Sequence, residues 1–257
     1  MAIKTRKISD WLSANGQAIT NASKATMEDA IRADIGQLHD GVFIMFHGKS
    51  DNYPLAVRVN SWASYQASGE IAEGVLLIEG GRHLIIAPTE ASSAKWSSKP
   101  VSSSDTSGSV QISGVTTTSD RITALNDFAG RANTTAIING STSSNVTNTA
   151  DYAAGFCNKY SRTNANGKGL TAGEWWLPSM GEMVIIWANF DKINYALSKI
   201  SGATQLQANW YWSSTQTSAT YAWGLRLLDG NVYYGYKFTQ GRVRPVSALI
   251  TKTYSVK

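Results

Sequence analysis

The chain is poor in the residues that carry out most chemistry at protein sites. It has a single cysteine, Cys157, and three histidines, His39, His47 and His83, in 257 residues. One cysteine excludes an internal disulfide framework, and its place in the apolar, helix-like run 153–157 indicates a small buried side chain rather than a reactive thiol. The histidines are far apart in the sequence, and no HExxH, GxSxG or phosphate-loop pattern is present. We therefore expect no catalytic step, no bound metal and no cofactor.

Charge is also sparse. Asp, Glu, Lys and Arg make up 16% of the residues, and the net charge of +5 comes from scattered basic side chains. Nucleic-acid-binding proteins cluster their basic residues into a stripe, so we expect no nucleic-acid partner. No apolar stretch approaches the length that crosses a bilayer, so we expect no membrane insertion. Residues 1–12 carry charge but no apolar segment follows them, so the sequence predicts no signal peptide.

Aromatic residues are abundant by contrast. The sequence holds nine Trp and eleven Tyr, which are residue types enriched where proteins bind other molecules. They gather in residues 211–249, where Tyr, Phe, Gly and Arg alternate with short apolar pieces. A protein core would not favour the sequence YYGYKF, and acids, bases and nucleophiles are few in this stretch. Aromatic surface spaced by glycine is typical of a binding face.

Residues 1–40 differ from the rest of the chain. Thr26 and Asp29 resemble a capping box at the start of a helix. Apolar residues then follow at helical spacing, at Met27, Ile31, Ile35 and Leu38. A helix this short is marginal alone, so we expect this segment to serve attachment or oligomerisation, with packing on the main domain as the open alternative.

From Gly41 the pattern changes to strands. Short apolar runs rich in Val, Ile and Leu occupy residues 41–48, 55–62, 74–81 and 83–90. Gly80 and Gly81 predict a hairpin between the last two runs. His83 lies in one of these strands, where we expect a structural imidazole, and His47 begins a polar stretch that we assign to a loop. Residues 91–119 are rich in Ser, Thr and Gly, which predicts a long surface loop anchored by Trp96.

Helical patterns occupy residues 123–138 and 151–161, and a longer one covers 179–200. In that last stretch the apolar spacing predicts one amphipathic helix, with Ser179 and Glu182 as its capping box. Strands return at 222–228, 231–238 and 242–249, with Asp229 and Gly230 as a turn. Because strands precede and follow a group of helices, the sequence predicts an α+β fold.

Several short motifs occur in a recognisable order: WWLPSMGEM at 175–183, YWSST at 211–215, AW at 222–223, DG at 229–230 and RVRPV at 242–246. With HLIIAP, KWSS, GRANTTAII and AAGFCNKYS upstream, the chain resembles C-type-lectin-fold domains of the formylglycine-generating enzyme superfamily. The resemblance is greatest to the variable proteins of diversity-generating retroelements, and it covers roughly residues 41–250. It implies a C-type lectin fold, a mixed, mainly antiparallel sheet with two flanking helices. The expected organisation is residues 1–40 for attachment, 41–250 for ligand binding with a variable region at about 210–245, and a tail at 251–257.

The resemblance also implies which residues vary. Diversification replaces template adenines, so AAY codons become codons that end in a pyrimidine and cannot encode Trp, Met, Lys, Glu or Gln. Trp212, Trp223, Lys237 and Gln240 should therefore belong to the constant framework. The expected variable, ligand-binding residues are Tyr211, Thr220, Tyr221, Gly224, Arg226, Leu228, Tyr233, Tyr234, Gly235, Tyr236, Phe238 and Gly241.

Strand periodicity gives a separate expectation for this region. A period of two in residues 222–228 places Trp223, Leu225 and Leu227 on a core face and Gly224, Arg226 and Leu228 on an outward face. Residues 231–238 lack such alternation, which favours a loop or an irregular edge. We expect Arg242 and Arg244 to form framework ion pairs at the edge of the sheet.

The enzymes of the resembling superfamily use paired cysteines, and Cys157 is alone. Calcium-binding lectins hold the metal with motifs such as Glu-Pro-Asn, which is missing here, and Asn209-Trp210 is followed by Tyr211 rather than an acid. The resemblance therefore favours a non-enzymatic protein that binds a cell-surface protein or glycan receptor through a diversified face. Its expected setting is a phage tail-fibre tip in the virion, as a homo-oligomer with a trimer favoured; otherwise it would be cytoplasmic or exported by a non-standard route. A non-diversified bacterial lectin-like adhesin, an inactive relative of the enzymes and a hydrolase with an unrecognised site remain as alternatives.

Overall fold

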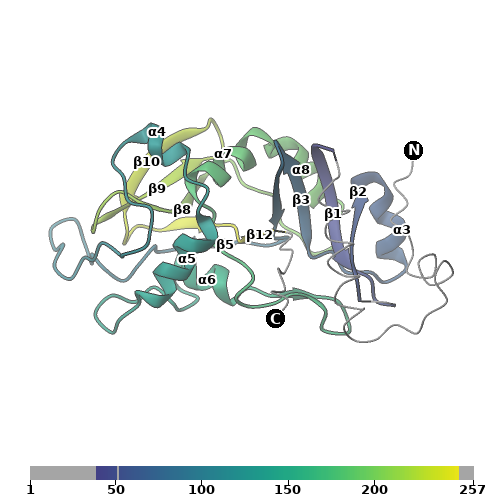
Figure 1. Cartoon of the computed structure of the whole chain (residues 1–257), viewed down its shortest axis with the longest axis horizontal. Helices are drawn as coiled ribbons and strands as arrows, with labels where there is room; N and C mark the ends of the chain where they lie inside the picture. The colour runs from purple at the N-terminus through teal and green to yellow at the C-terminus, as the bar shows by residue number, and fades with distance from the viewer. Residues whose placement is uncertain (1–38, 51, 249–257) are drawn as a thin grey trace, which may run out of the picture.

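The structure of the chain is a computed structural model that describes residues 39–50 and 52–248. The helix expected within residues 26–38 and the tail at 251–257 therefore lie outside the described residues. The described residues form a mixed α+β architecture with mostly antiparallel sheets, as the sequence predicts. Two five-stranded sheets lie at opposite ends of an elongated molecule, with helices between and below them (Figure 1).

The first sheet is antiparallel throughout and holds most of the N-terminal strands. Its strand order is β12-β4-β3-β1-β2. The strands are β1 (Gly41–His47), β2 (Pro54–Arg58), β3 (Gly74–Glu79), β4 (Arg82–Ile86) and β12 (Val246–Ser247). Gly80 and Gly81 make the β3–β4 turn with φ values of +55° and +75°, a backbone region that glycine enters without steric cost. The predicted hairpin is confirmed.

The second sheet carries the C-terminal strands in the order β10-β9-β8-β11-β5. Its strands are β5 (Ala91–Ala94), β8 (Trp210–Gln216), β9 (Tyr221–Arg226), β10 (Asn231–Tyr236) and β11 (Gly241–Val243). Its pairs are antiparallel except for β11 with β8. A separate two-stranded ribbon joins β6 (Arg162–Thr163) to β7 (Gly169–Leu170). The prediction of a loop or irregular edge at 231–238 is wrong. Strand β10 is a regular edge strand that pairs with β9 over all six of its residues.

The helical segments are short. They are η1 (Val59–Ser61), α3 (Trp62–Ala67), α4 (Arg121–Leu125), α5 (Gly130–Asn139), α6 (Ala153–Lys159), α7 (Met180–Ala188) and α8 (Phe190–Leu197). Residues 55–62 were expected to form one strand, but β2 ends at Arg58, and η1 and then α3 follow it. Cys157 is free and buried within α6, as predicted. No helix in the part of the chain that the structure describes has the length and apolarity needed to span a bilayer.

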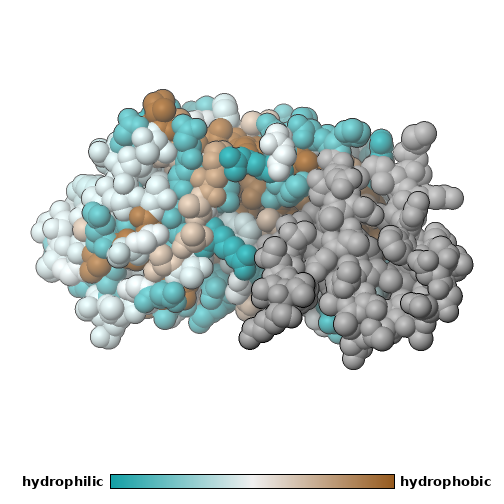
Figure 2. All heavy atoms as spheres, viewed as in Figure 1, coloured by the Kyte–Doolittle hydropathy of each residue, from teal (hydrophilic) through white to brown (hydrophobic). Residues whose placement is uncertain are grey.

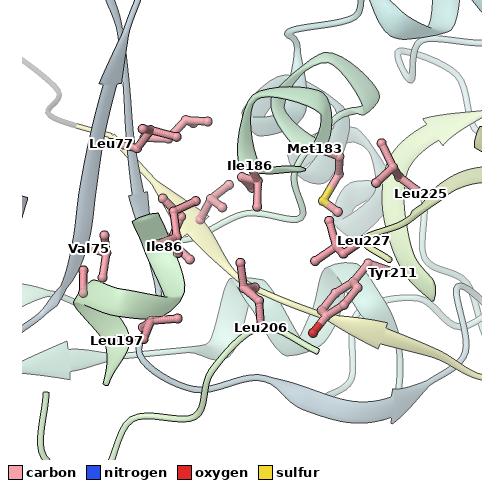
Figure 3. Packing of buried hydrophobic residues seen from close by; sticks show 14 of the residues in the cluster. Val75, Leu77, Ile86, Met183, Ile186, Leu197, Leu206, Tyr211, Leu225 and Leu227 are labelled. Atoms are coloured by element: carbon pink, nitrogen blue, oxygen red, sulfur yellow. The ribbon is translucent and has the colours of Figure 1, made fainter. Parts of the chain in front are cut away.

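One hydrophobic core, which we call the shared core, joins the two sheets. Val75 and Ile86 reach it from the first sheet, Met183 and Ile186 from α7, and Leu225 from the second sheet (Figure 3). Burying large apolar side chains such as these stabilises the fold by about 1.5–3 kcal/mol each. The helices α7 and α8 therefore hold the second sheet in a fixed place relative to the first.

The single helix predicted over 179–200 is wrong, because Asn189 divides it into α7 and α8. The Asn189 backbone leaves the helical region, and its side-chain amide donates to Ile185 O and to Glu79 of the first sheet. The start of α7 is as predicted: Ser179 and Glu182 form a capping box, in which Ser179 N donates to Glu182 Oε2 at 2.8 Å. A polar contact with another element thus overrides continuous apolar spacing.

Two expectations about polar segments have different outcomes. His47 was assigned to a loop, but it is the last residue of β1 and is buried, with its Nδ1 hydrogen-bonded to buried Glu73. The loop predicted over 91–119 is wrong for its first four residues, because Ala91–Ala94 form β5 of the second sheet. Residues 95–119 lack long regular elements, and Trp96 anchors them as predicted. Its indole is buried and donates from Nε1 to Ser213 O at 2.9 Å. The surface over these residues and the second sheet is mostly pale or hydrophilic, with isolated apolar patches (Figure 2).

Candidate binding face on the β9–β10 hairpin

The hairpin of β9 and β10 lies at the free edge of the second sheet (Figure 1). Its turn contains Asp229 and Gly230, as predicted, with Gly230 at φ +71° and its N–H donating to Arg226 O at 2.9 Å. Asp229 also forms an exposed ion pair with Arg226. The register pairs Tyr233 with Gly224 and Tyr234 with Trp223. Because successive residues of a strand point to opposite sides, these pairs alternate between the two faces of the sheet.

We name the two sides by what they pack against. The α7 face of the hairpin carries side chains whose buried members join the shared core, and comprises Tyr221, Trp223, Leu225, Val232, Tyr234 and Tyr236. The Trp212 face lies on the other side and comprises Trp210, Trp212, Gly224, Arg226, Tyr233 and Gly235. The expected variable residues therefore do not share a single face.

An aromatic cluster covers the outer part of the α7 face. The ring of Tyr221 lies 5.4 Å from that of Tyr234 and 4.3 Å from that of Tyr236. Tyr234 also meets Trp223 edge-on at 5.3 Å, and Phe238 extends the cluster from Tyr236 at 5.2 Å. Trp223 is buried at its base and donates from Nε1 to Thr118 O, whereas 52% of Tyr234 is exposed. The cluster thus presents several rings to solvent on one fixed base.

The Tyr221 phenol of this cluster remains a hydrogen-bond donor at neutral pH. A hydrogen bond with Tyr236 is the largest cause that raises the pKa of Tyr221, to about 12. A phenol that stays protonated can donate one hydrogen bond and accept others from a ligand. The cluster therefore combines ring surface with directional polar groups.

The Trp212 face carries a second aromatic group. Trp210 stacks on Tyr233 with ring centroids 3.9 Å apart, and it meets Trp212 edge-on at 5.5 Å. Glycines let these indoles lie flat on the sheet. A Cβ on Gly224 would lie 2.2 Å from the Trp210 ring, and one on Gly241 would lie 2.8 Å from the Trp212 ring. Close approach of a ring to the backbone requires glycine at both positions.

Lys237 fixes the end of β10 to the interior. This lysine is fully buried, and its Nζ donates to Gln216 Oε1 at 2.8 Å and to Val110 O at 3.3 Å. The ammonium also lies 4.3 Å from the centre of the Trp96 ring. Burial lowers the pKa of Lys237 to about 7. Its expected place in the constant framework agrees with this complete burial.

The buried carboxylate of Glu90 binds three side chains of the second sheet and its flanking residues. Glu90 accepts from Arg242 Nη1 at 2.6 Å, from Arg244 Nη2 at 2.7 Å and from the Tyr211 hydroxyl at 2.7 Å. The predicted framework ion pairs of Arg242 and Arg244 are therefore present. Arg242 does not lie at a sheet edge, because β11 runs between β8 and β5, and Arg244 follows the end of β11.

For three of the expected variable residues, Tyr211, Gly224 and Gly241, the prediction of a place on the binding face is wrong, because they are buried. Tyr211 is fully buried in the shared core with its hydroxyl between Glu90 and the Gln207 N–H. Gly224 and Gly241 are buried beneath the Trp210 and Trp212 rings. Any change at these three sites would disturb the core or the indoles, so they belong to the framework rather than to the face.

The other nine expected residues lie at or near the surface. Tyr221, Tyr234, Tyr236 and Phe238 come together in the aromatic cluster. Arg226 and Tyr233 lie on the Trp212 face, where 43% of Tyr233 is exposed. Leu228 is 63% exposed, as predicted, but it lies in the turn, because β9 ends at Arg226 and does not continue to residue 228. Thr220 and Gly235 are half-buried, and the Thr220 carbonyl accepts from Lys237 N at 3.0 Å.

Sequence reasoning missed two aromatic residues at this site. Trp210 is half-buried and stacks on Tyr233, and Trp187 of α7 is partly exposed beside the turn, where a Cβ on Gly230 would lie 2.4 Å from its ring. A period of two from Trp212 would have placed Trp210 on the same face. No comparable signal identifies Trp187, because its position on α7 follows the apolar spacing of a core residue.

The hollows of the described surface lie away from the β9–β10 hairpin. One of about 880 Å³ lies on the first sheet, lined in part by Val42, Phe43, Val59 and Tyr195. Within residues 39–50 and 52–248, no group of three or more His, Cys, Asp or Glu side chains is placed to hold a metal ion. The exposed aromatic residues of the β9–β10 hairpin therefore remain the candidate site.

Comparison with known proteins places the chain in no family. No protein-family model matches it, and no curated protein matches it. Among solved structures, a fimbrial protein from Bacteroides ovatus ATCC 8483 is similar, with a TM-score of 0.48 and 15% sequence identity. The similarity covers 82% of this chain and 49% of that protein, so the chain spans about half of its length. At this identity and TM-score the likeness assigns neither a family nor a function.

Proposed function

We propose that this chain is a non-enzymatic binding protein that recognises a cell-surface protein or glycan receptor through the β9–β10 hairpin. The observation that carries the proposal is the aromatic cluster of Tyr221, Tyr234, Tyr236 and Phe238 above buried Trp223. Tyr rings supply large contact areas and lose little conformational entropy on binding, because they have few rotatable bonds. Placing them on a hydrogen-bonded hairpin reduces that loss further.

The chemistry of the exposed groups favours binding over catalysis. The hairpin offers phenols, aromatic rings and the Arg226–Asp229 pair, whose charges already satisfy each other. Rings and phenols bind by stacking and hydrogen bonding, on sugars and on proteins alike. The hairpin therefore has the composition of a recognition surface, and the proposal includes no catalytic step, metal or cofactor.

We propose further that the fold is a C-type lectin fold and that a retroelement diversifies this surface. Support comes from the motif order in the sequence and from the division between fixed and exposed residues. Trp212, Trp223 and Lys237, which diversified AAY codons cannot encode, are all buried. Gln240, the fourth residue expected in the constant framework, is exposed, and its side chain accepts a hydrogen bond from Ser93. The exposed residues of the hairpin that we assign to the variable set are ones that such codons reach. Tyr211, Gly224 and Gly241 are excluded from that set.

The proposed setting is a phage tail-fibre tip, where a trimer would raise avidity without new contacts. The alternative is a non-diversified bacterial lectin-like adhesin or a catalytically inactive relative of the formylglycine-generating enzymes. The DNA distinguishes them. A near-identical repeat of the segment encoding residues 210–245, differing at adenines and close to a reverse-transcriptase gene, is expected under the proposal. A complete genome without such a repeat would contradict diversification and leave the adhesin.

Binding itself is tested with a double variant, Tyr234→Ala with Tyr236→Ala. The matched control is Tyr195→Ala, which removes a ring of similar exposure on α8, outside the hairpin. Both proteins are labelled and applied to intact bacterial cells and to a glycan microarray. Truncating central Tyr residues at an interface typically costs about 2 kcal/mol or more each, so binding by the double variant should be lost. Undiminished binding by the double variant, with the control also unchanged, would overturn the proposed site.

A further inference from the structure

The backbone of β10 has a free edge whose hydrogen-bonding groups can be assigned residue by residue. Leu227 N donates to Asn209 O at 2.9 Å, which makes this pair one of the hydrogen-bonded pairs between β9 and β8. Such pairs recur at every second residue of an antiparallel ladder. With the register of Tyr211 opposite Leu225, the backbone groups of Leu225 and Leu227 face β8. Those of Ala222, Gly224 and Arg226 therefore face β10.

The same alternation fixes the direction of the groups on β10. Asn231, Tyr233 and Gly235 stand opposite Arg226, Gly224 and Ala222 and exchange their hydrogen bonds with them. Lys237 N donates to Thr220 O at 3.0 Å, two residues further along, which continues the pattern. Val232, Tyr234 and Tyr236 therefore direct their N–H and C=O groups away from the sheet.

One of these six groups is satisfied within the hairpin. The Tyr236 carbonyl accepts from Thr239 N at 2.9 Å and from Thr239 Oγ1 at 2.7 Å. The N–H groups of Val232, Tyr234 and Tyr236 and the carbonyls of Val232 and Tyr234 have no hydrogen-bond partner among the described residues. They form a row with the two-residue period of an extended strand.

This edge lacks the features that usually prevent strand addition. Soluble proteins protect sheet edges with proline, charged residues, bulges or very short strands. The other sheet edges follow this rule: β2 begins with Pro54 and ends with Arg58, β12 has two residues and β5 has four. In contrast, β10 has six residues without proline or charge and pairs with β9 without a bulge.

We propose that the β10 edge binds an extended polypeptide segment of a protein receptor, which adds to the second sheet as a further strand. The proposal rests on the function proposed above and narrows its partner to a protein. A polypeptide backbone repeats N–H and C=O groups at the period of the free edge, and a glycan does not. The aromatic cluster on the α7 face and Tyr233 on the Trp212 face flank the edge, so both can contact alternate side chains of the added strand.

The test compares two variants at one position. Tyr234→Ala removes the ring and keeps the outward N–H, whereas Tyr234→Pro removes both. Proline is tolerated on edge strands where its nitrogen faces outward, so both variants should fold. The probe is a library of random 12-residue peptides, selected on the whole wild-type protein. The dissociation constants of the selected peptides are then measured with each protein.

Tyr234→Pro should weaken these peptides by about tenfold more than Tyr234→Ala, which corresponds to one lost hydrogen bond. Amide hydrogen exchange on the wild-type protein gives a second readout that needs no variant. Peptide binding should slow exchange at the N–H groups of Val232 and Tyr234, whereas those of Tyr233 and Gly235 should be protected already. If Tyr234→Pro fails to fold, this measurement decides alone.

Each other outcome has a defined meaning. Equal losses in the two variants, without slowed exchange, would overturn strand addition and leave a side-chain binding face. Failure to select any peptide would overturn a polypeptide partner, while the cell and glycan experiments continue to test the proposed function separately. Self-association that Tyr234→Pro abolishes would assign the edge to a second copy of the chain and overturn the proposal as well.

Discussion

Lys237 Nζ donates a hydrogen bond to Gln216 Oε1 at 2.8 Å, and both side chains are fully buried. Gln216 in turn donates from Nε2 to Ile112 O and Thr117 Oγ1. The last residue of β8 and the residue after β10 thus connect the sheet to the loop at 110–118. Buried polar contacts of this kind contribute to the free energy of unfolding, and removing one partner leaves the other unsatisfied.

The first concerns the pH dependence that Lys237 contributes. Burial lowers its pKa to about 7, below the value of about 10.4 for an unfolded lysine. Between these pH values the folded chain holds fewer protons, so its free energy of unfolding should rise with pH, by up to about 1.4 kcal/mol per pH unit. This contribution is lost as the pH falls through 7. Urea denaturation between about pH 6.5 and 9.5 should show this rise in the wild type and not in Lys237→Met. If the free energy of unfolding changes with pH equally in both proteins, the prediction is contradicted.

Glu182 should contribute in the opposite direction. Burial is the main cause that raises its pKa to about 7. The folded chain therefore holds more protons than the unfolded chain between about pH 4.3 and 7. The free energy of unfolding gained from this residue is present at low pH and is lost as the pH rises through 7. Glu182→Gln should remove this decline, because glutamine stays neutral and retains an acceptor for Ser179 N. A decline of equal slope in the variant would contradict the assignment.

Gly224→Ala should destabilise the hairpin. The new methyl group would lie 2.2 Å from the Trp210 ring and 2.4 Å from Tyr211 O, so the indole and the strand beneath it must move. Overpacking of this kind costs about 1–3 kcal/mol. The control is Gly235→Ala, where the closest atoms are 3.3 Å away and belong to side chains of Thr239 and Trp212. Thermal melting and tryptophan fluorescence should change more for Gly224→Ala. A larger change at Gly235 would refute the packing.

Tyr211→Phe tests the buried hydroxyl. Its removal takes one hydrogen bond from Glu90 and leaves the Gln207 N–H without its acceptor. We expect a loss of about 1–3 kcal/mol in the free energy of unfolding. In the control, Tyr195→Phe, the lost hydroxyl bonds to Asn60 at the surface, and the change should stay within about 0.5 kcal/mol. Similar losses in the two variants, measured by urea denaturation, would show that the Glu90 contacts contribute little.

Local chemistry explains which parts of the fold could be predicted. The Gly80-Gly81 turn and the Ser179–Glu182 capping box depend on residues close in sequence, and both are present. The alternation in β9 also gave the correct faces, because one side of that strand is apolar and the other is mixed. The break at Asn189 could not be predicted, since it follows from a contact with Glu79, more than a hundred residues away.

The binding face was predicted in part for the same reason. In β8, Tyr211 and Trp212 point to opposite faces and both are buried, so alternation carries no information about exposure there. The identity of Gly224 also gave no sign that a ring covers it. Strand pairing decides both features, and pairing depends on contacts distant in the sequence.

The burial of Lys237 has a consequence for how much the hairpin sequence can change. A slip of one residue along β10 would turn this lysine to the opposite face and bring Tyr236 or Phe238 against Gln216. The loss of a paired buried amine would oppose that slip, whichever residues occupy positions 233–236 and 238. One buried side chain thus fixes the alignment of the strand, and under the proposed diversification its neighbours would be exchanged without moving the backbone that carries them.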